Sequence, residues 1–402
     1  MTGSMPTRET VLALLRQLVA INSVNPTLAP GESTGEAAIA ASCVDWLQAQ
    51  GVRAWTEEVA PGRANAVAEV GAGDGPTLVF CAHLDTVSTQ GMEIPPFEAR
   101  LEGGRLYGRG AYDMKGGVAA IMAAAASLAA ARDLHGRVLL ALVCDEEFAS
   151  LGADDFVRRH AADACILTEP SHGALILAHK GFVWTKLSTA GVAAHGSRWE
   201  EGVSAIGRMA RIVTELERFD AEVLRRRTHP LVGPASLHCA TITGGSGWST
   251  YAAECTLRVE RRTIPGETPE DVLLELEQAV RRAGENATVE LLFQRPPLVC
   301  EPDAPIARAV RDAATTVTGR APEETGVAYW MDAAVFAGAG IPAVNYGGGG
   351  TGAHAAIEWA DLDSCVTTAR VLVQAARRFC GSPSGDDPPP ITGPAGVSPE
   401  DA

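Results

Sequence analysis

Short apolar runs alternate with segments of helical periodicity through the first 170 residues. Residues 77–82 form such a run behind Gly75-Pro76, a pattern typical of a strand buried on both faces. Further runs occupy residues 137–143 and 164–167, and the alanine-rich segment 118–131 between them predicts a helix. Buried strands separated by helices predict an α/β fold with a mostly parallel sheet.

Helices are also predicted near both ends of the chain. Apolar residues at helical spacing mark residues 10–21. Ser33-x-x-Glu36 has the form of a capping box and predicts a second helix that ends at Gly51. Strands are expected at residues 53–58 and 65–70, and later helices at 306–318 and 370–379.

The pattern changes between about residues 180 and 293. Residues 182–188 and 256–262 alternate like half-exposed strands, whereas 203–216 and 269–283 have the periodicity of amphipathic helices. This order predicts a separate α+β domain inserted into the first. We therefore expect a main domain in two parts, residues 1–179 and 295–380, an inserted domain at 180–294, and a disordered proline-rich tail at 381–402.

Composition and charge exclude several classes of protein. The 402 residues are 46% hydrophobic and carry a formal charge of −16, which argues against nucleic acid or an anionic membrane as a partner. The N-terminus lacks an apolar core of signal-peptide length, and no apolar run of membrane-spanning length is evident. Nine cysteines without a Cys-x-x-Cys pair do not suggest a disulfide framework, so we expect a reducing cytoplasm.

Polar side chains follow the predicted buried strands at the points where the strands end. The carboxyl ends of parallel strands meet at one edge of a sheet, where ligands bind in open α/β folds. A glycine-rich loop between two of these strands supplies one more carboxylate. The side chains expected at this edge are His83, Asp113, Glu146, Glu147, Glu169 and His354, and Asp85 follows His83 by two residues.

Two histidines and four carboxylates suggest a metal centre. The alternatives are weaker, because the glycine-rich loop lacks the Gly-Lys-Ser/Thr phosphate-binding signature and helix capping alone does not explain several strand ends. The donors suit zinc, or cobalt or manganese in its place, and so many acids would repel one another without cations. Two divalent ions would need one bridging carboxylate. We also expect that Glu146 and Glu147 cannot both face the metals from an extended segment, which leaves one to act on a water, as in a hydrolase.

These motifs resemble those of a known family. Taken together, residues 8–379 are similar to the di-zinc aminoacylases, acetylornithine deacetylases, succinyl-diaminopimelate desuccinylases and carboxypeptidases G. The resemblance rests on His83-x-Asp85, Gly110-x-x-Asp113-Met114-Lys115-Gly116-Gly117, Asp145-Glu146-Glu147, Glu169-Pro170 and His354 behind its glycine loop.

The resemblance implies a role for each of these residues. His83 and Glu169 would hold one metal, Glu147 and His354 would hold the other, and Asp113 would bridge the two. Asp85 would orient His83. Glu146 would be the general base that later protonates the leaving amine.

The inserted segment resembles the lid domain of the family, which also mediates dimerisation. His195, in Ala194-His195-Gly196-Ser197, matches the histidine that reaches the active site of the partner subunit. Arg262 matches the arginine that binds the substrate carboxylate. The chain departs from the family at Ser249 and Ala252, which stand where an Asn and a Pro are common. A more aromatic acyl site is expected from Trp248, Tyr251, Tyr329 and Trp330.

The implied function is metal-dependent hydrolysis of the amide bond of an N-acyl amino acid, by a homodimer joined through the lid domain. A dipeptidase or carboxypeptidase on the same scaffold is the alternative within enzymes. A non-catalytic binding relative is the alternative from another class, and the Glu146-Glu147 pair argues against it, since a binder needs no free base.

Overall fold

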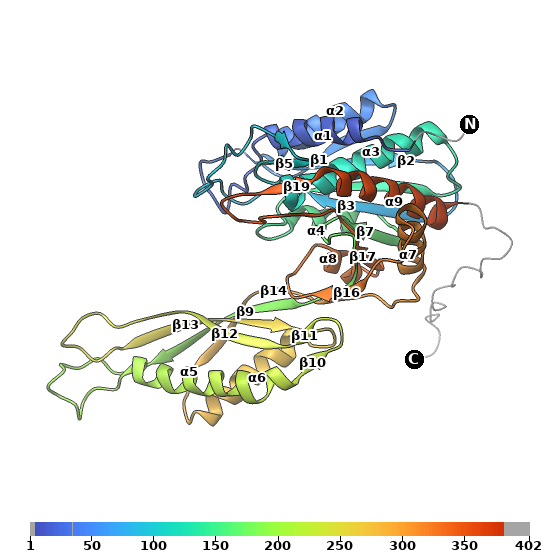
Figure 1. The fold of residues 1–402 in the computed structure, drawn as a ribbon. Helices are drawn as coiled ribbons and strands as arrows, with labels where there is room; N and C mark the ends of the chain where they lie inside the picture. The colour runs from blue at the N-terminus through green and yellow to red at the C-terminus, as the bar shows by residue number, and fades with distance from the viewer. Residues whose placement is uncertain (1–4, 34, 382–402) are drawn as a thin grey trace.

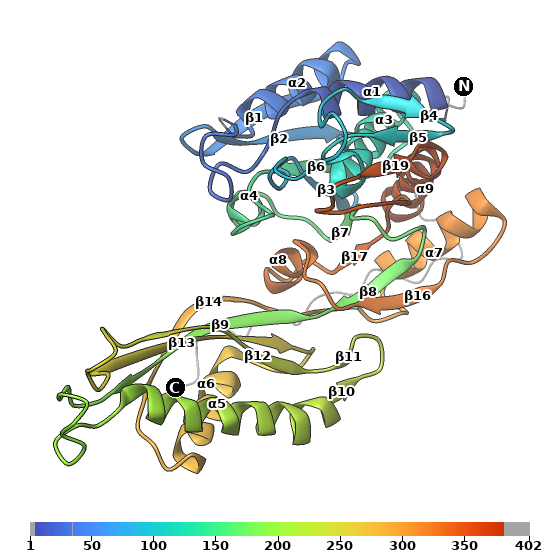
Figure 2. The same ribbon diagram turned by 60° about the vertical axis from the view of Figure 1, so that its left-hand side comes forward.

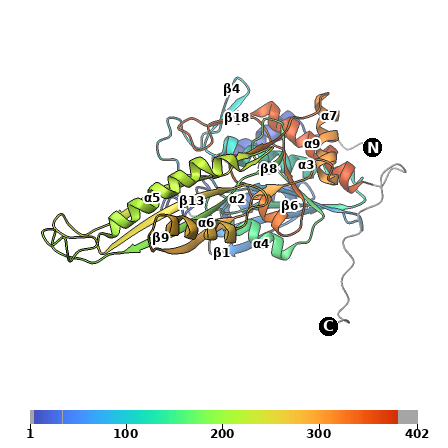
Figure 3. The same ribbon diagram turned by 90° about the horizontal axis from the view of Figure 1, so that it is seen from below.

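The chain folds into a main domain and a lid domain that projects from one side of it. The computed structural model describes residues 5–33 and 35–381. In Figures 1 and 2 the lid lies below the main domain, and Figure 3 shows it from below as an elongated arm. Of the predicted tail at residues 381–402, all but Gly381 lies outside the described residues.

A nine-stranded sheet forms the centre of the main domain. Its strands, in the order in which they pair, are β1 (Arg53–Ala60), β2 (Arg63–Val70), β6 (Arg137–Val143), β3 (Thr77–His83), β7 (Ala164–Leu167), β17 (Ala343–Asn345), β8 (Leu175–His179) and β15 (Leu298–Val299), and β16 (Glu324–Val327) also pairs with β8. The four central strands β6, β3, β7 and β17 run parallel. The predicted α/β class with a mostly parallel sheet is confirmed.

Helices cover both faces of this sheet and create two cores. One face packs against α1 (Arg8–Ala20), α2 (Ala37–Ala49), α3 (Gly116–Ala131), α7 (Pro305–Thr318) and α9 (Leu362–Cys380), and the other against α4 (Leu151–Arg159) and α8 (Ala333–Gly338). Alternate residues of β3 enter the two cores, Phe80 on one side and Val79 and Cys81 on the other. Burial on both faces explains why β3 is continuously apolar.

The apolar helix of the main domain is buried in its core. Residues Ala111–Ala131 are long and apolar enough to cross a membrane by length and composition, although Asp113 and Lys115 interrupt the apolar run. However, 72% of its most apolar window is buried within the protein. The segment is accounted for as a core helix.

A small sheet holds two loops of the main domain together. Its strands, in the order in which they pair, are β18 (Gly350–Thr351), β19 (Trp359–Asp361), β5 (Arg105–Tyr107) and β4 (Arg100–Glu102). The strand β5 leads into the turn η1 (Ala111–Lys115), and β18 leads to His354. Segments that are more than 250 residues apart in the chain, such as Tyr107 and Trp359, are thereby aligned side by side.

The lid is a four-stranded antiparallel sheet with two helices on one face. The strands pair in the order β12 (Ser236–Gly244), β13 (Glu254–Thr263), β9 (Gly181–Ala190) and β14 (Thr288–Arg295), and the helices are α5 (Ala205–Glu222) and α6 (Pro269–Arg282). A turn η2 (Leu224–Arg226) and the hairpin β10 (Thr228–His229) and β11 (Gly233–Pro234) complete it. Alternate residues of β13, such as Leu257 and Val259, join a third core beneath the helices.

The predicted capping box before α2 is wrong. Glu36 occupies the N-cap position, but its side chain makes no capping hydrogen bond. Its buried carboxylate instead accepts hydrogen bonds from Arg63 and from the backbone N–H of Asp145. An ion pair in the interior has replaced the local cap.

Arg63 is the centre of this buried network. Its Nη2 lies 2.6 Å from Glu36 Oε1 and 2.7 Å from Asp145 Oδ1. Both carboxylates are fully buried, so each depends on the guanidinium for compensation of its charge. The network fixes the residue that immediately precedes Glu146.

Arg63→Leu should therefore destabilise the protein strongly. It leaves two carboxylates buried and unpaired, which typically costs about 3–5 kcal/mol of unfolding free energy. Arg53→Leu is the matched control, since Arg53 pairs with Glu69 while 75% exposed, and it should cost no more than about 1 kcal/mol. Urea denaturation of both variants measures the difference, and equal losses would contradict the role of Arg63.

Candidate active site

Four adjacent parallel strands deliver polar residues to one edge of the central sheet. His83 is the last residue of β3, Glu146 and Glu147 follow β6, and Glu169 follows β7. The loop after β17 carries His354 by way of β18. Asp113 lies in η1, just before α3.

The histidines and carboxylates form two adjacent groups joined by Asp113. His83 Nε2 lies 3.2 Å from Asp113 Oδ1 and 3.4 Å from Glu169 Oε1. His354 Nε2 lies 3.4 Å from Asp113 Oδ2 and 3.0 Å from Glu147 Oε2. Each oxygen of Asp113 thus faces a different histidine, as a carboxylate shared by two ions would.

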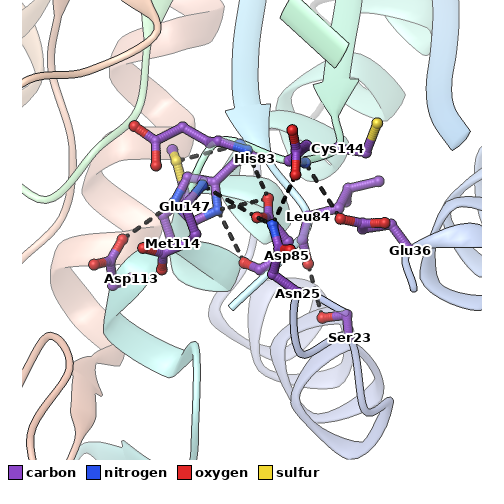
Figure 4. A network of polar contacts seen from close by, with 12 residues as sticks. Ser23, Asn25, Glu36, His83, Leu84, Asp85, Asp113, Met114, Cys144 and Glu147 are labelled. Carbon is purple, nitrogen blue, oxygen red and sulfur yellow. Dashed lines mark hydrogen bonds and ion pairs between the residues drawn. The ribbon is translucent and has the colours of Figure 1, made fainter. Parts of the chain in front are cut away.

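Asp85 orients the site through its backbone and its side chain together. Its carbonyl oxygen accepts a hydrogen bond from His83 Nδ1 at 2.9 Å, whereas its carboxylate is 3.7 Å from the same nitrogen. The carboxylate accepts instead from the backbone N–H groups of Glu146 and Glu147, each at 3.1 Å, and from Asn25. Figure 4 shows Asp85 at the centre of this network.

The expectation that Glu146 and Glu147 lie on an extended segment is wrong. Asp145 has a φ of 70°, and its carbonyl accepts hydrogen bonds from the N–H groups of Phe148, Ala149 and Ser150, so the chain turns here. Both glutamates consequently face the site. Glu147 groups with His83 and Asp113, and Glu146 groups with His83 and Glu169, each group having ligand atoms within 4.8 Å of one another.

The electrostatics of the site favour bound cations. Burial raises the pKa of the Glu146, Glu147 and Glu169 carboxyls above their usual range. Hydrogen bonds to Asp113 and Glu147 raise the pKa of His354 to about 10. Without cations, the negative charges are compensated by protons, which bind either to the carboxylates themselves or to the neighbouring histidines. A set of nitrogen and oxygen donors with this surplus of negative charge fits two divalent transition ions.

Glu358 fastens two of the loops to each other, a role that sequence analysis missed. Its Oε1 accepts from the backbone N–H groups of Tyr112 and Asp113, at 3.0 and 3.1 Å. Its Oε2 accepts from Gly110 N–H at 2.9 Å and from Arg109 Nη1 at 2.7 Å. The carboxylate therefore holds the loop of Asp113 against the segment that follows His354.

A cavity of about 490 Å³ opens over these residues and extends to the lid. Arg262 lines it from β13, and its guanidinium bonds Glu260 through Nε alone, so both terminal nitrogens are without partners in the described chain. Tyr329 and Trp330 also line the cavity, together with lid residues that the sequence did not indicate. Those residues are Phe182, Trp184, Phe293 and Arg295.

Three other residues singled out in the sequence lie elsewhere. His195 is exposed in the loop between β9 and α5 and does not line this cavity. Trp248 is fully exposed and Tyr251 packs against Gly202, so neither contributes to the predicted aromatic acyl site. Within this chain, the loop of His195 and the metal-binding edge are separate.

Comparisons with known proteins agree with this geometry. The family model described as peptidase family M20/M25/M40 matches residues 79–378. The chain belongs to this family. It is a metal-dependent hydrolase of amide bonds.

Relatives and solved structures resemble the chain over most of its length. An acetylornithine deacetylase from Vibrio cholerae is 28% identical over 383 residues, covering 92% of this chain and 98% of the relative. The one from Proteus mirabilis is 32% identical over 274 residues, 65% of this chain and 69% of the relative. The crystal structure of aminopeptidase PepT from Bacillus cereus superposes with a TM-score of 0.78 at 21% identity, over 94% of this chain and all of that one.

Glu358→Ala should weaken metal binding. The loop of Asp113 loses its four hydrogen bonds to the carboxylate, and loss of a group that positions a ligand typically lowers metal affinity about 10- to 100-fold. Glu301→Gln is the control, because Glu301 is exposed and its side chain makes no hydrogen bond with the described residues. Metal retained after dialysis against graded chelator measures the effect. Retention equal to that of the unsubstituted protein would show that Glu358 does not position Asp113.

Proposed function

We propose that the protein hydrolyses the amide bond of N-acyl amino acids, as the acetylornithine deacetylases that it resembles do by name. The observation that carries the proposal is the cavity in which the metal-binding edge and the Arg262 guanidinium face the same space, the two terminal nitrogens of Arg262 making no hydrogen bond with the described residues. A guanidinium with two free nitrogens suits a bidentate contact with a carboxylate. A substrate with a carboxylate next to the scissile amide could place the amide at the metal-binding edge and the carboxylate on Arg262.

Two divalent ions, most simply zinc, with cobalt or manganese as substitutes, would occupy the two groups of ligands. His83 and Glu169 would hold one ion, His354 and Glu147 the other, and Asp113 both. Bound ions of this kind lower the pKa of a water molecule and polarise an amide carbonyl. Asp85 and Glu358 keep the ligands in place through the backbone.

Glu146 is proposed as the general base. Its carboxylate lines the cavity, lies in the same group as His83 and Glu169, and makes no hydrogen bond with the described residues. A carboxylate without such a partner is free to accept a proton from water first and to give it to the leaving amine afterwards. Asp85 positions it by binding its backbone N–H.

A dipeptidase or carboxypeptidase is the second candidate, since a metallo-carboxypeptidase from Sulfolobus solfataricus and human carnosine dipeptidase 1 share the fold. The same edge and the same Arg262 would serve a peptide with a free carboxylate. Comparing acylated amino acids with dipeptides as substrates separates the two.

We further propose a cytoplasmic homodimer joined through the lid. His195 lies outside the cavity of its own chain, and in such a dimer it would reach the site of the partner. There its imidazole would donate a hydrogen bond to the oxyanion that forms when water attacks the amide, a contact worth about 3–4 kcal/mol.

Protein purified without chelator should contain transition metal and hydrolyse N-acyl amino acids. Glu146→Gln should retain the metal but lose about 10²- to 10⁴-fold in kcat, since it removes acid–base catalysis while keeping the shape of the side chain. Metal analysis and steady-state kinetics measure both. The proposal fails if no metal is found and added zinc or cobalt restores no hydrolysis, and near-normal turnover of the variant would refute the role of Glu146.

Two inactive variants should complement each other in a mixed dimer. His195→Ala and Glu146→Gln homodimers should both be nearly inactive. A heterodimer pairs one intact Glu146 with an intact His195 from the other chain, so random pairing of equal amounts should restore about a quarter of the activity of the unsubstituted protein. Co-expression with two affinity tags measures this. An inactive, purified heterodimer would show that His195 does not act across subunits.

A further inference from the structure

The face of the lid sheet opposite α5 and α6 carries two rows of aromatic and charged residues. In one row, Phe182 on β9 lies between Arg262 on β13 and Arg295 on β14. In the next, Trp184 lies between Glu260 and Phe293. All of these residues except Glu260 line the cavity over the metal-binding edge.

Four aromatic rings on this side of the cavity contact one another and form what we name the aromatic wall: Phe182, Trp184, Phe293 and Trp330. The ring centroid of Phe182 lies 5.1 Å from that of Trp184, 6.0 Å from that of Phe293 and 6.2 Å from that of Trp330. The three rings from the lid strands belong to none of the three hydrophobic cores of the described chain. Trp184 is 38% exposed. Packing in these three cores therefore does not account for the rings, although Phe182 is only 9% exposed.

Two guanidinium groups lie beside the wall, and they differ in whether they can bind a substrate carboxylate. Arg262 can, whereas Arg295 is already paired. Arg295 is paired with both oxygens of Asp154 and lies over Phe293 and Trp330. Arg262 is held at Nε by Glu260, which also accepts from Trp184 Nε1 at 2.8 Å. Glu260 thus holds Arg262, the proposed binding group for the carboxylate, and the ring of Trp184 in fixed positions relative to each other.

The covalent structure of an amino acid indicates that its side chain, and not the acyl group, would contact the wall. The guanidinium carbon of Arg262 lies 5.4 Å from the centre of the Phe182 ring. The side chain of an amino acid is attached to the same carbon as its carboxylate, so a carboxylate on Arg262 brings that side chain beside Phe182. The acyl group would lie on the other side of the scissile amide, towards the metal-binding edge.

We propose that the aromatic wall is the binding site for the side chain of the substrate's amino acid and selects aromatic or large apolar side chains. This inference rests on the proposed function. Burial of an aromatic side chain against such rings is favourable, and ring–ring contacts add to it. An ammonium group on the side chain, as in ornithine, would be desolvated near two guanidinium groups and is disfavoured.

Two constitutional isomers test the placement directly. N-acetyl-phenylalanine carries its phenyl group on the amino acid, and N-phenylacetyl-alanine carries it on the acyl group. We expect kcat/KM for N-acetyl-phenylalanine to exceed that for its isomer, for N-acetyl-alanine and for N-acetylornithine, the excess over N-acetyl-alanine being about 10- to 150-fold. Equal values, or a preference for the isomer or for N-acetylornithine, would overturn the inference.

Substitutions in the wall test which residues carry the preference. Trp184→Ala and Phe293→Ala should each reduce the ratio of kcat/KM for N-acetyl-phenylalanine to that for N-acetyl-alanine, and Trp184→Phe should keep most of it. Leu274→Ala, on the exposed side of α6, is the control and should leave the ratio unchanged. An unchanged ratio in both alanine variants would overturn the inference. Hydrolysis of N-acyl amino acids without the aromatic preference would refute only the wall, whereas no hydrolysis of any would refute the proposed function itself.

Discussion

Mutual repulsion among buried carboxylates is the constraint on which this structure depends. Glu146, Glu147 and Glu169 meet at one sheet edge because the strands that precede them, β6 and β7, run parallel on either side of β3, and Asp113 joins them from η1. Burial raises the pKa of three of these carboxyl groups, which expresses how unfavourable their charges are in the absence of cations. The fold can hold these carboxylates together because the free energy of metal binding offsets the unfavourable interaction of their charges.

Three further acids keep that arrangement in place without facing the substrate. Asp85 binds the backbone of Glu146 and Glu147, and Glu358 binds the backbone of Tyr112 and Asp113. Glu36 acts one step further away, through Arg63 and Asp145. In each case a buried carboxylate accepts several N–H donors, which stabilises its charge and fixes the loop at the same time. The geometry of the ligands is therefore set by main-chain hydrogen bonds more than by side-chain packing.

The sequence predicted the parts of this site that follow from local pattern. Continuous apolar strands revealed the parallel sheet, and the polar residues at their ends revealed His83, Glu147 and Glu169, because periodicity and strand polarity are local properties. The turn at Asp145 was missed because a left-handed non-glycine residue leaves no sequence signal. The function of Glu358 depends on the loop of Asp113, which is 245 residues away in the chain. Local sequence patterns cannot predict a contact over this separation. The strands β12 and β14 were also missed, since both expose many of their residues.

The aromatic wall could not be predicted from the sequence, because it too depends on contacts between distant segments. Its position also shows what each domain contributes to the site. Phe182, Phe293 and Arg262 are far apart in the chain and become neighbours only through the register of three antiparallel strands. One face of that sheet is required for the core of the lid, so its opposite face is free to carry residues that lie outside this core. The central strands of the main domain are buried on both faces and have no such freedom, so they contribute residues at their ends. The metal-binding residues and the proposed base therefore lie at the sheet edge of one domain, and most of the proposed site for the substrate's side chain lies on the open face of the other.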